Sequence, residues 1–262
     1  MKITVCSLDI AWEDKQLNFQ KVESLLSQME QPGDLFVLPE MFSTGFTMNT
    51  SLAEDAAGET LKWMIATAQK YNVALMGSVP YSQNGRDVFN RAYFVYPCGT
   101  WKHYDKRHLF RMGEENNYYT RGEDKCIVEY KGVNICLNIC YDIRFPVWSR
   151  NIGNRYDVLI NIANFPEVRI NAIEPLIRAR AIENMAYGIF VNRDGKDPMC
   201  VYCPSSQMYD YKGAPIAEEF YLKDCTGFNT QMLSCNINLE ELNDFRFKFP
   251  AWMDADTFNV IR

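Results

Sequence analysis

Four acidic, basic and thiol side chains in this sequence could together perform nucleophilic chemistry. Glu40, Lys106 and Cys140 each stand at the end of a predicted strand, and Glu114 or Glu115 lies in the polar loop after Lys106. A thiol that attacks an amide or nitrile carbon needs a base or a nearby cation, and the resulting oxyanion needs a positive group and a backbone N–H. Taken singly, each residue is better explained as a helix cap, a surface charge or a core thiol. Taken together, they supply every group that this chemistry requires.

The run that ends on Cys140 has the alternation of a strand. Residues 133–139 place apolar side chains at every second position. Asp142 and Pro146 follow and cannot continue a buried strand, so Cys140 falls where the strand ends. Ligand chemistry in α/β proteins gathers at such strand ends. Cys136, four residues earlier, is interpreted as a core thiol.

The elements around these residues begin as strand, helix, strand, helix, strand. Strands are expected at 3–8, 35–38 and 73–79, and apolar stripes predict helices at 15–29 and 59–71. This order is typical of crossover units, with helices outside a central sheet. Later elements are expected as strands at 88–96, 101–104, 126–130, 158–162, 189–192, 205–211 and 231–237, and helices at 147–154, 173–187 and 239–244.

Composition limits the class of protein and its partners. The 262 residues are 47% hydrophobic, enough for a large core, and no linker or repeat divides them, so we expect one domain, 1–262. Their net charge of −6 makes nucleic acid and anionic membranes poor partners. No apolar stretch approaches the ~18 residues that span a bilayer. Nine cysteines without a signal-peptide pattern fit free thiols in the cytoplasm.

The segments that carry the three candidate residues resemble the Glu–Lys–Cys motifs of the nitrilase, or carbon–nitrogen hydrolase, superfamily. Their order and spacing agree with that family along nearly the whole chain, and within it the sequence looks most like the omega-amidase branch. The triad segments are Leu38-Pro39-Glu40-Met41-Phe42, Tyr104-Asp105-Lys106-Arg107-His108-Leu109-Phe110 and Asn138-Ile139-Cys140-Tyr141-Asp142-Ile143-Arg144-Phe145-Pro146. The branch segments are PEMFSTGF (39–46), NRAYFV (90–95), FPVWSRN (145–151), ARAIENMAY (179–187) and FPAWMD (249–254).

This resemblance implies a fold and a catalytic mechanism. The fold would be an α/β, four-layer αββα sandwich with two central sheets, which dimerises or forms a higher homo-oligomer. Cys140 would be acylated with release of ammonia and freed by water, and Glu40 would be the general base. Lys106 and the backbone N–H of Tyr141 would hold the oxyanion. Glu115 has the family spacing, seven residues before a glycine, and would position Lys106 and the substrate nitrogen.

The implied substrates are small α-keto dicarboxylic acid monoamides such as 2-oxoglutaramate and 2-oxosuccinamate, with water as co-substrate and no cofactor or metal. Their free carboxylate needs a cation, for which Arg144, Arg178 and Arg193 are open candidates. The pocket walls are expected from Phe42, Phe46, Tyr141 and Phe165. The chain departs from common family patterns in two places, and both bear on substrate preference. They are Ala163-Asn164-Phe165-Pro166, where many relatives have Trp, and Tyr202-Cys203-Pro204-Ser205-Ser206, where they have Gly.

Several alternatives remain open from the sequence. The triad would serve equally an aliphatic amidase, an N-carbamoyl amino acid amidohydrolase or a nitrilase. Cys140 could pair with His103 or His108 in a Cys–His hydrolase. Cys200 and Cys203 have CxxC spacing, which would suit zinc if a second cysteine pair lay nearby. Finally, the aromatic segment 245–258 could be an interface of a non-catalytic assembly protein, although it more plausibly packs on the body or on a second subunit.

Overall fold

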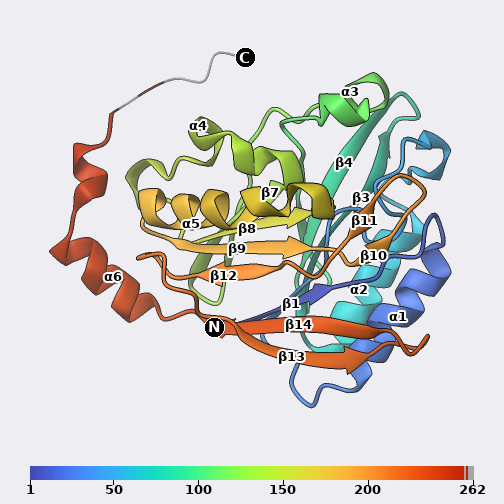
Figure 1. Ribbon diagram of the computed structural model, residues 1–262, viewed down its shortest axis with the longest axis horizontal. Coiled ribbons are helices and arrows are strands. Elements are labelled where there is room, and N and C mark those ends of the chain that lie inside the picture. The colour runs from blue at the N-terminus through green and yellow to red at the C-terminus, as the bar shows by residue number, and fades with distance from the viewer. Residues whose placement is uncertain (257, 259–262) are drawn as a thin grey trace.

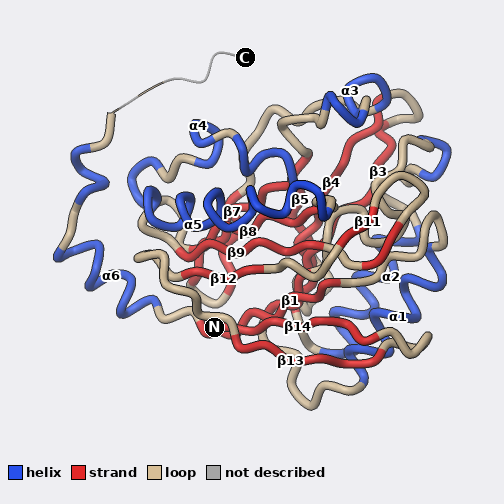
Figure 2. The backbone as a smooth tube through the Cα atoms, viewed as in Figure 1, coloured by secondary structure: helices blue, strands red, loops and turns tan. Residues whose placement is uncertain are grey.

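The computed structural model describes residues 1–256 and 258 as two sheets that lie face to face, with helices outside (Figure 1). Figure 2 shows the strands gathered at the centre and most helices at the periphery. One sheet has the order β13 (Glu218–Lys223), β14 (Asn229–Asn236), β1 (Lys2–Ser7), β2 (Leu35–Val37), β3 (Ala74–Gln83), β4 (Asp87–Val95), β5 (Trp101–Asp105). The other has the order β12 (Gln207–Tyr209), β9 (Tyr187–Asn192), β8 (Val158–Ala163), β7 (Val133–Ile139), β6 (Ile127–Tyr130).

A small hairpin and six α-helices complete the described elements. The hairpin pairs β10 (Gly195–Lys196) with β11 (Val201–Tyr202). The helices are α1 (Lys15–Ser27), α2 (Glu59–Tyr71), α3 (Glu115–Tyr118), α4 (Pro146–Ser149), α5 (Ile173–Asn184) and α6 (Leu239–Lys248). Short 3-10 segments cover Thr50–Leu52, Arg111–Gly113, Cys140–Arg144, Ile152–Asn154, Glu167–Ala172 and Ala251–Asp254. In the part of the chain described here, no helix has the length and apolar character needed to cross a bilayer.

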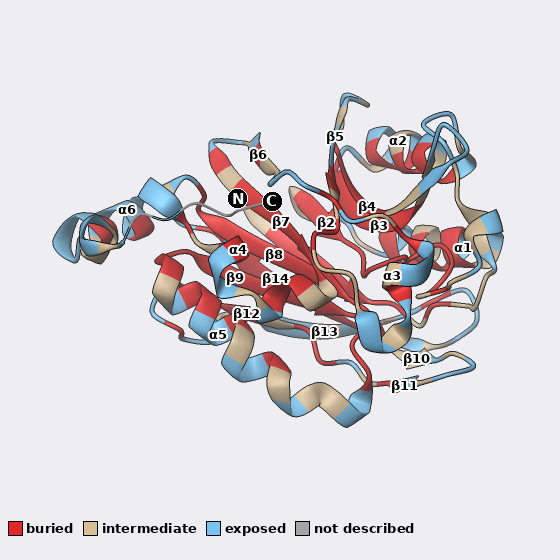
Figure 3. Cartoon of the chain, turned by 90° about the horizontal axis from the view of Figure 1, so that it is seen from above, coloured by how far each residue is buried: buried red, intermediate tan, exposed pale blue. Residues whose placement is uncertain are grey.

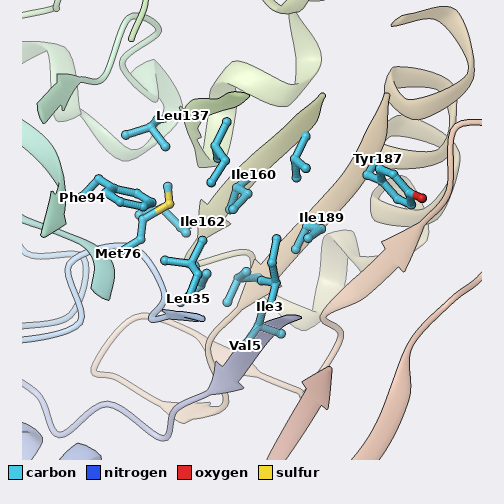
Figure 4. Packing of buried hydrophobic residues seen from close by; sticks show 14 of the residues in the cluster. Ile3, Val5, Leu35, Met76, Phe94, Leu137, Ile160, Ile162, Tyr187 and Ile189 are labelled. Carbon is cyan, nitrogen blue, oxygen red and sulfur yellow. The ribbon is translucent and has the colours of Figure 1, made fainter. Parts of the chain in front are cut away.

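The alternation of side chains along the strands builds three apolar layers. Figure 4 shows Ile3, Val5 and Met76 of one sheet facing Ile160 and Ile189 of the other, in the layer between the sheets. The neighbouring positions on the strands point outward, onto α1 and α2 on one side and onto α5 on the other. Because both faces of the central strands are covered, these strands are buried throughout (Figure 3). The expected αββα sandwich is therefore confirmed.

The direction of each strand determines at which edge of its sheet the carboxyl end of that strand lies. β1, β2 and β3 are mutually parallel, as are β7, β8 and β9. β5 is antiparallel to β4, which is itself antiparallel to β3, so β5 ends on the same edge as β2 and β3. The start of β4 lies on that edge too. Residues that follow β2, β5, β7 and β8 can therefore meet.

The structure differs from the expected elements mainly in the second half of the chain. β13 was not expected, because it is an edge strand whose side chains are mostly exposed. The helix expected at 147–154 is only α4 followed by a 3-10 turn, because the backbone leaves the helical region at Arg150, where ψ is 128°. α5 ends at Asn184, where Met185 turns to φ 48°. Residue 257, in the expected aromatic segment 245–258, lies outside the described residues.

Candidate active site

The structure brings three of the predicted catalytic side chains into direct contact. Lys106 Nζ lies 2.8 Å from Glu40 Oε1 and 2.9 Å from Glu115 Oε2. All three side chains are fully buried. Glu40 follows β2, Lys106 follows β5, and Glu115 opens α3, so one sheet edge and the loop after it supply the cluster. A buried cluster of this kind holds fixed charges in a low-dielectric setting, where they act strongly on a bound substrate.

Tight turns fix Glu40 and Lys106 in place. The residue after Glu40, Met41, has φ 44°, and its N–H donates to Ser78 Oγ at 2.8 Å. Behind Lys106 the chain closes on Gly122, whose N–H donates to the Lys106 carbonyl at 2.8 Å. A Cβ on Gly122 would lie 2.0 Å from the Asp105 carbonyl oxygen, so only glycine fits this close approach. The presence of glycine at position 122, seven residues after Glu115, thus has a steric reason.

The charges within the cluster oppose the cost of burial. Burial by itself lowers the pKa of Lys106, but the Glu115 and Glu40 carboxylates outweigh it and raise that pKa above its usual value. Lys106 is therefore a cation. Burial raises the pKa of Glu115, with Lys106 acting in the opposite direction. The Phe110 N–H, which donates to Glu115 Oε2 at 2.6 Å, also favours the ionised form.

Cys140 stands at the end of β7, on the other sheet, and opens the 3-10 segment Cys140–Arg144. Its φ of 44° is a left-handed conformation that costs a non-glycine residue about 1–3 kcal/mol. The turn projects the half-buried side chain toward the pocket that Glu40 also lines. Burial and the Glu40 carboxylate raise the pKa of the Cys140 thiol well above its usual value, against the effect of Lys106. Cys140 therefore rests as a neutral thiol that interacts with Glu40.

A pocket of about 470 Å³ opens beside Cys140. Tyr141, Arg144 and Phe165 line it as expected, and Phe46 does so too. Phe42 does not line it, which corrects the expectation. Its fully buried ring packs against the rings of Phe19 and Trp63, with centroids 6.5 and 5.7 Å away, in the layer between the sheet and helices α1 and α2.

Two of the three candidate arginines lie elsewhere. Arg193 is completely buried and donates to the backbone carbonyls of Ile10, Asp194 and Lys196, so it braces the β10–β11 hairpin. Arg178 pairs with Glu174 on the exposed face of α5. Arg144 does line the pocket, and so does a cation that the sequence did not indicate, Arg169. Arg169 lies three residues after the Ala-Asn-Phe-Pro motif, which is the only sequence signal that could have drawn attention to it.

Two asparagines were also missed and contact the two carboxylates of the cluster. The backbone N–H of Asn164 donates to Glu40 Oε2 at 2.8 Å, and its side chain donates to the Glu40 carbonyl at 2.7 Å. The side chain of Asn90 donates to Glu40 Oε1 at 2.8 Å and to Glu115 Oε1 at 3.2 Å. Both residues belong to segments that resemble the family.

The rival arrangements find less support in the geometry. His108 Nδ1 lies 2.8 Å from Asp142 Oδ1, and its ring stacks on Phe145 at 3.8 Å. His103 lies on β5 with its ring beside Trp101. Neither histidine lines the pocket that contains Cys140. Across residues 1–256 and 258, no three His, Cys, Asp or Glu side chains are grouped as metal ligands.

Comparison with known proteins agrees with this fold. The carbon-nitrogen hydrolase family matches residues 2–246. Omega-amidase YafV of Escherichia coli (strain K12) is 38% identical over 261 residues, covering 99% of this chain and 98% of that protein. A 2-oxoglutaramate amidase of Bacillus subtilis (strain 168) is 31% identical, covering 97% and 98%. The crystal structure of a CN-hydrolase superfamily protein from Xanthomonas campestris, with an arsenic adduct in the active site, aligns with a TM-score of 0.89 at 33% identity and covers 99% of this chain and 98% of that one.

The sandwich, the buried acid–lysine cluster and the adjacent thiol are those of an amidohydrolase. The chain belongs to the carbon–nitrogen hydrolase family, the nitrilase superfamily. Its similarity to omega-amidase YafV and to 2-oxoglutaramate amidase places it in the omega-amidase-like branch of that family.

Proposed function

We propose that this enzyme hydrolyses the terminal amide of small α-keto dicarboxylic acid monoamides, such as 2-oxoglutaramate and 2-oxosuccinamate. The products are the keto diacid and ammonia. The names of two relatives, an omega-amidase and a 2-oxoglutaramate amidase, support this substrate class.

The reaction proceeds through a thioester on Cys140. Glu40 takes the thiol proton as Sγ attacks the amide carbon, while Lys106 Nζ and the Tyr141 backbone N–H stabilise the oxyanion. Glu40 then returns the proton to the departing nitrogen, and ammonia leaves. Water, deprotonated by Glu40, attacks the thioester, and breaking the C–S bond restores the thiol. Glu115 holds Lys106 in place and faces the substrate nitrogen.

The observation that carries the choice of substrate is a pair of unneutralised cations on the wall of the same pocket. Arg144 lies over the ring of Phe165 at 5.7 Å, and Arg169 lies over the ring of Phe110 at 4.8 Å. Among the described residues neither arginine forms a salt bridge. A guanidinium that is supported by an aromatic ring and has no carboxylate partner suits an anionic substrate group. A keto acid monoamide offers one carboxylate at the end opposite its amide.

The test is ammonia release from 2-oxoglutaramate, a simple aliphatic amide, an N-carbamoyl amino acid and a nitrile, with wild type and Cys140→Ala. We expect the keto amide to be preferred and Cys140→Ala to be inactive on all four. Turnover of the keto amide by Cys140→Ala would refute the thioester mechanism. Preference for the nitrile or the carbamoyl compound would keep the mechanism and replace the substrate.

We further propose that the enzyme works in the cytoplasm as a homodimer or higher homo-oligomer. Apolar side chains on α6 and the segment after it support the assembly, because Phe247, Phe249 and Met253 are all exposed. Light scattering after size exclusion measures the mass in solution, and a monomer would contradict the oligomer.

A further inference from the structure

Asn90 occupies a central position in the buried cluster. It lies on β4, it is fully buried, and its Nδ2 group contacts both carboxylates, at 2.8 Å from Glu40 and 3.2 Å from Glu115. Its backbone carbonyl also accepts the N–H of Lys106 at 2.9 Å. One residue thus contacts the base, the second glutamate and the lysine.

The cluster has an imbalance of charge that Asn90 is suited to offset. Two buried carboxylates share the single positive charge of Lys106, so full ionisation leaves one excess negative charge. Two carboxylates at such a site tend to share a proton, because each disfavours the ionised form of the other. Among the described residues, the side-chain donors that reach both carboxylates are Lys106 and Asn90. A neutral amide donor favours the ionised form without adding a charge.

The side-chain carbonyl oxygen of Asn90 provides a second, independent observation that its amide is placed for the carboxylates. Asn90 Oδ1 is buried and has no hydrogen-bond partner among the described residues. A buried acceptor without a partner destabilises the fold, and a residue retained for packing alone would avoid it. The orientation of the amide is therefore dictated by its donor end, which faces the carboxylates.

We propose that Asn90 is a positioning residue that keeps Glu40 and Glu115 ionised together around Lys106. Without its donor, one carboxylate takes up a proton. If that carboxylate is Glu40, it can no longer accept the proton of Cys140. If it is Glu115, the hold on Lys106 weakens. The inference rests on the proposed thioester chemistry, in which ionised Glu40 is the base.

The test compares the pH dependence of kcat/KM for wild type, Asn90→Leu and Asn90→Asp. Loss of the donor moves the acidic limb upward by about one pH unit. Asn90→Asp keeps the shape but adds a third carboxylate, so its limb moves at least as far. Asn184→Leu is the matched control, because Asn184 is a buried amide whose partners are Arg180 and Asn151, away from the cluster. Its acidic limb stays at the wild-type pH.

A measurement without turnover keeps this proposal separable from the proposed function. Alkylation of Cys140 by iodoacetamide, followed by peptide mass analysis, reports the same base at each pH even if no amide is hydrolysed. We expect its pH dependence to shift upward in both Asn90 variants and to stay unchanged in Asn184→Leu. If the acidic limb of kcat/KM and the pH profile of Cys140 alkylation both stay at the wild-type pH in Asn90→Asp, the proposal is overturned. This outcome does not depend on whether Asn90→Leu folds.

Discussion

Tyr104 and Asp142 form a hydrogen bond that ties the two sheets together beside the catalytic residues. The Tyr104 hydroxyl donates to Asp142 Oδ2 at 2.7 Å. Tyr104 stands two residues before Lys106, and Asp142 stands two residues after Cys140. Asp142 also accepts the backbone N–H of Ile139, the residue before Cys140, at 3.0 Å. The hydrogen bond between Tyr104 and Asp142 therefore helps to set the separation between Lys106 and the Cys140 thiol.

Removing that bond should reduce both activity and stability. Tyr104→Phe removes one hydrogen-bond donor to Asp142. We expect kcat/KM to fall roughly 10-fold, because the relative positions of Lys106 and Cys140 are then less well fixed. Unfolding free energy should fall by about 1–3 kcal/mol. Tyr156→Phe is the control, since its buried hydroxyl donates to the Ser149 carbonyl at 2.6 Å and touches no catalytic segment. Equal losses of activity in the two variants would contradict this role for Tyr104.

Replacing Lys106 should damage both catalysis and the fold. Lys106→Met leaves two carboxylates buried without a cation, and we expect kcat to fall by at least about 10²-fold and unfolding free energy by about 3–5 kcal/mol. Burial already raises the pKa of Glu115, so the deficit in stability is present above its ordinary pKa of 4.5 and shrinks as the pH falls toward that value. Urea unfolding at several pH values measures this. Lys70→Met, which breaks an exposed pair with Glu23, should change stability by less than about 1 kcal/mol.

The left-handed backbone at Cys140 predicts an order of stability among inactive variants. Cys140→Gly should be more stable to urea than Cys140→Ala by about 1 kcal/mol, because glycine adopts φ 44° without the clash that a Cβ brings. Cys136, on the same strand, offers a control: Cys136→Gly should be less stable than Cys136→Ala. If alanine were the more stable at position 140, the turn would not be strained.

The two arginines of the pocket should affect charged substrates selectively. Arg144→Met and Arg169→Met should each raise KM for 2-oxoglutaramate roughly 10- to 100-fold, the loss of one charge-assisted hydrogen bond. KM for a neutral aliphatic amide should change little. Arg178→Met removes a surface cation of α5 and should leave both values as they are. An equal rise in KM for both substrates would mean that the arginines shape the pocket but do not bind the substrate carboxylate.

The raised pKa of the Cys140 thiol predicts a flat alkaline profile. Because burial and Glu40 hold the thiol neutral, ionisation of Cys140 should add no activity between about pH 7 and pH 9. If a histidine activated the thiol, kcat/KM would instead follow the titration of a group with a pKa near 6.5. The profile of kcat/KM against pH, repeated with His103→Gln, distinguishes these cases. We expect His103→Gln to keep wild-type activity. Loss of activity would support a catalytic dyad of Cys140 and His103.

Local patterns were sufficient to predict much of the fold and the centre of the site. Strands buried on both faces and amphipathic helices such as α2 carry their signal in consecutive residues. Glu40 and Cys140 each follow a buried strand, Lys106 follows the partly exposed β5, and their mutual order resembled a known family. The structure adds the distances that join Lys106 to both glutamates.

The missed features depend on contacts between distant segments. Asn90 lies inside a strand, so no strand end marked it, and its role appears only when residues 50 positions apart in sequence meet. β13 has few apolar residues because it covers only one edge of its sheet. Phe42 follows Glu40 closely, but the turn at Met41 directs its ring into the core, away from the pocket.

The placement of β1 between β2 and β14 has a consequence for biosynthesis. Lys2 pairs with Asn236 and Ser7 with Gln231, so β1 completes its pairing only after β14 has been synthesised more than two hundred residues later. All four candidate catalytic side chains have been synthesised by residue 140, but the sheet that carries Glu40 is complete only about a hundred residues later. An unfinished or C-terminally truncated chain thus holds the whole set of reactive groups without the framework that aligns them. Amide-hydrolysing activity should therefore appear only after β14 has been synthesised.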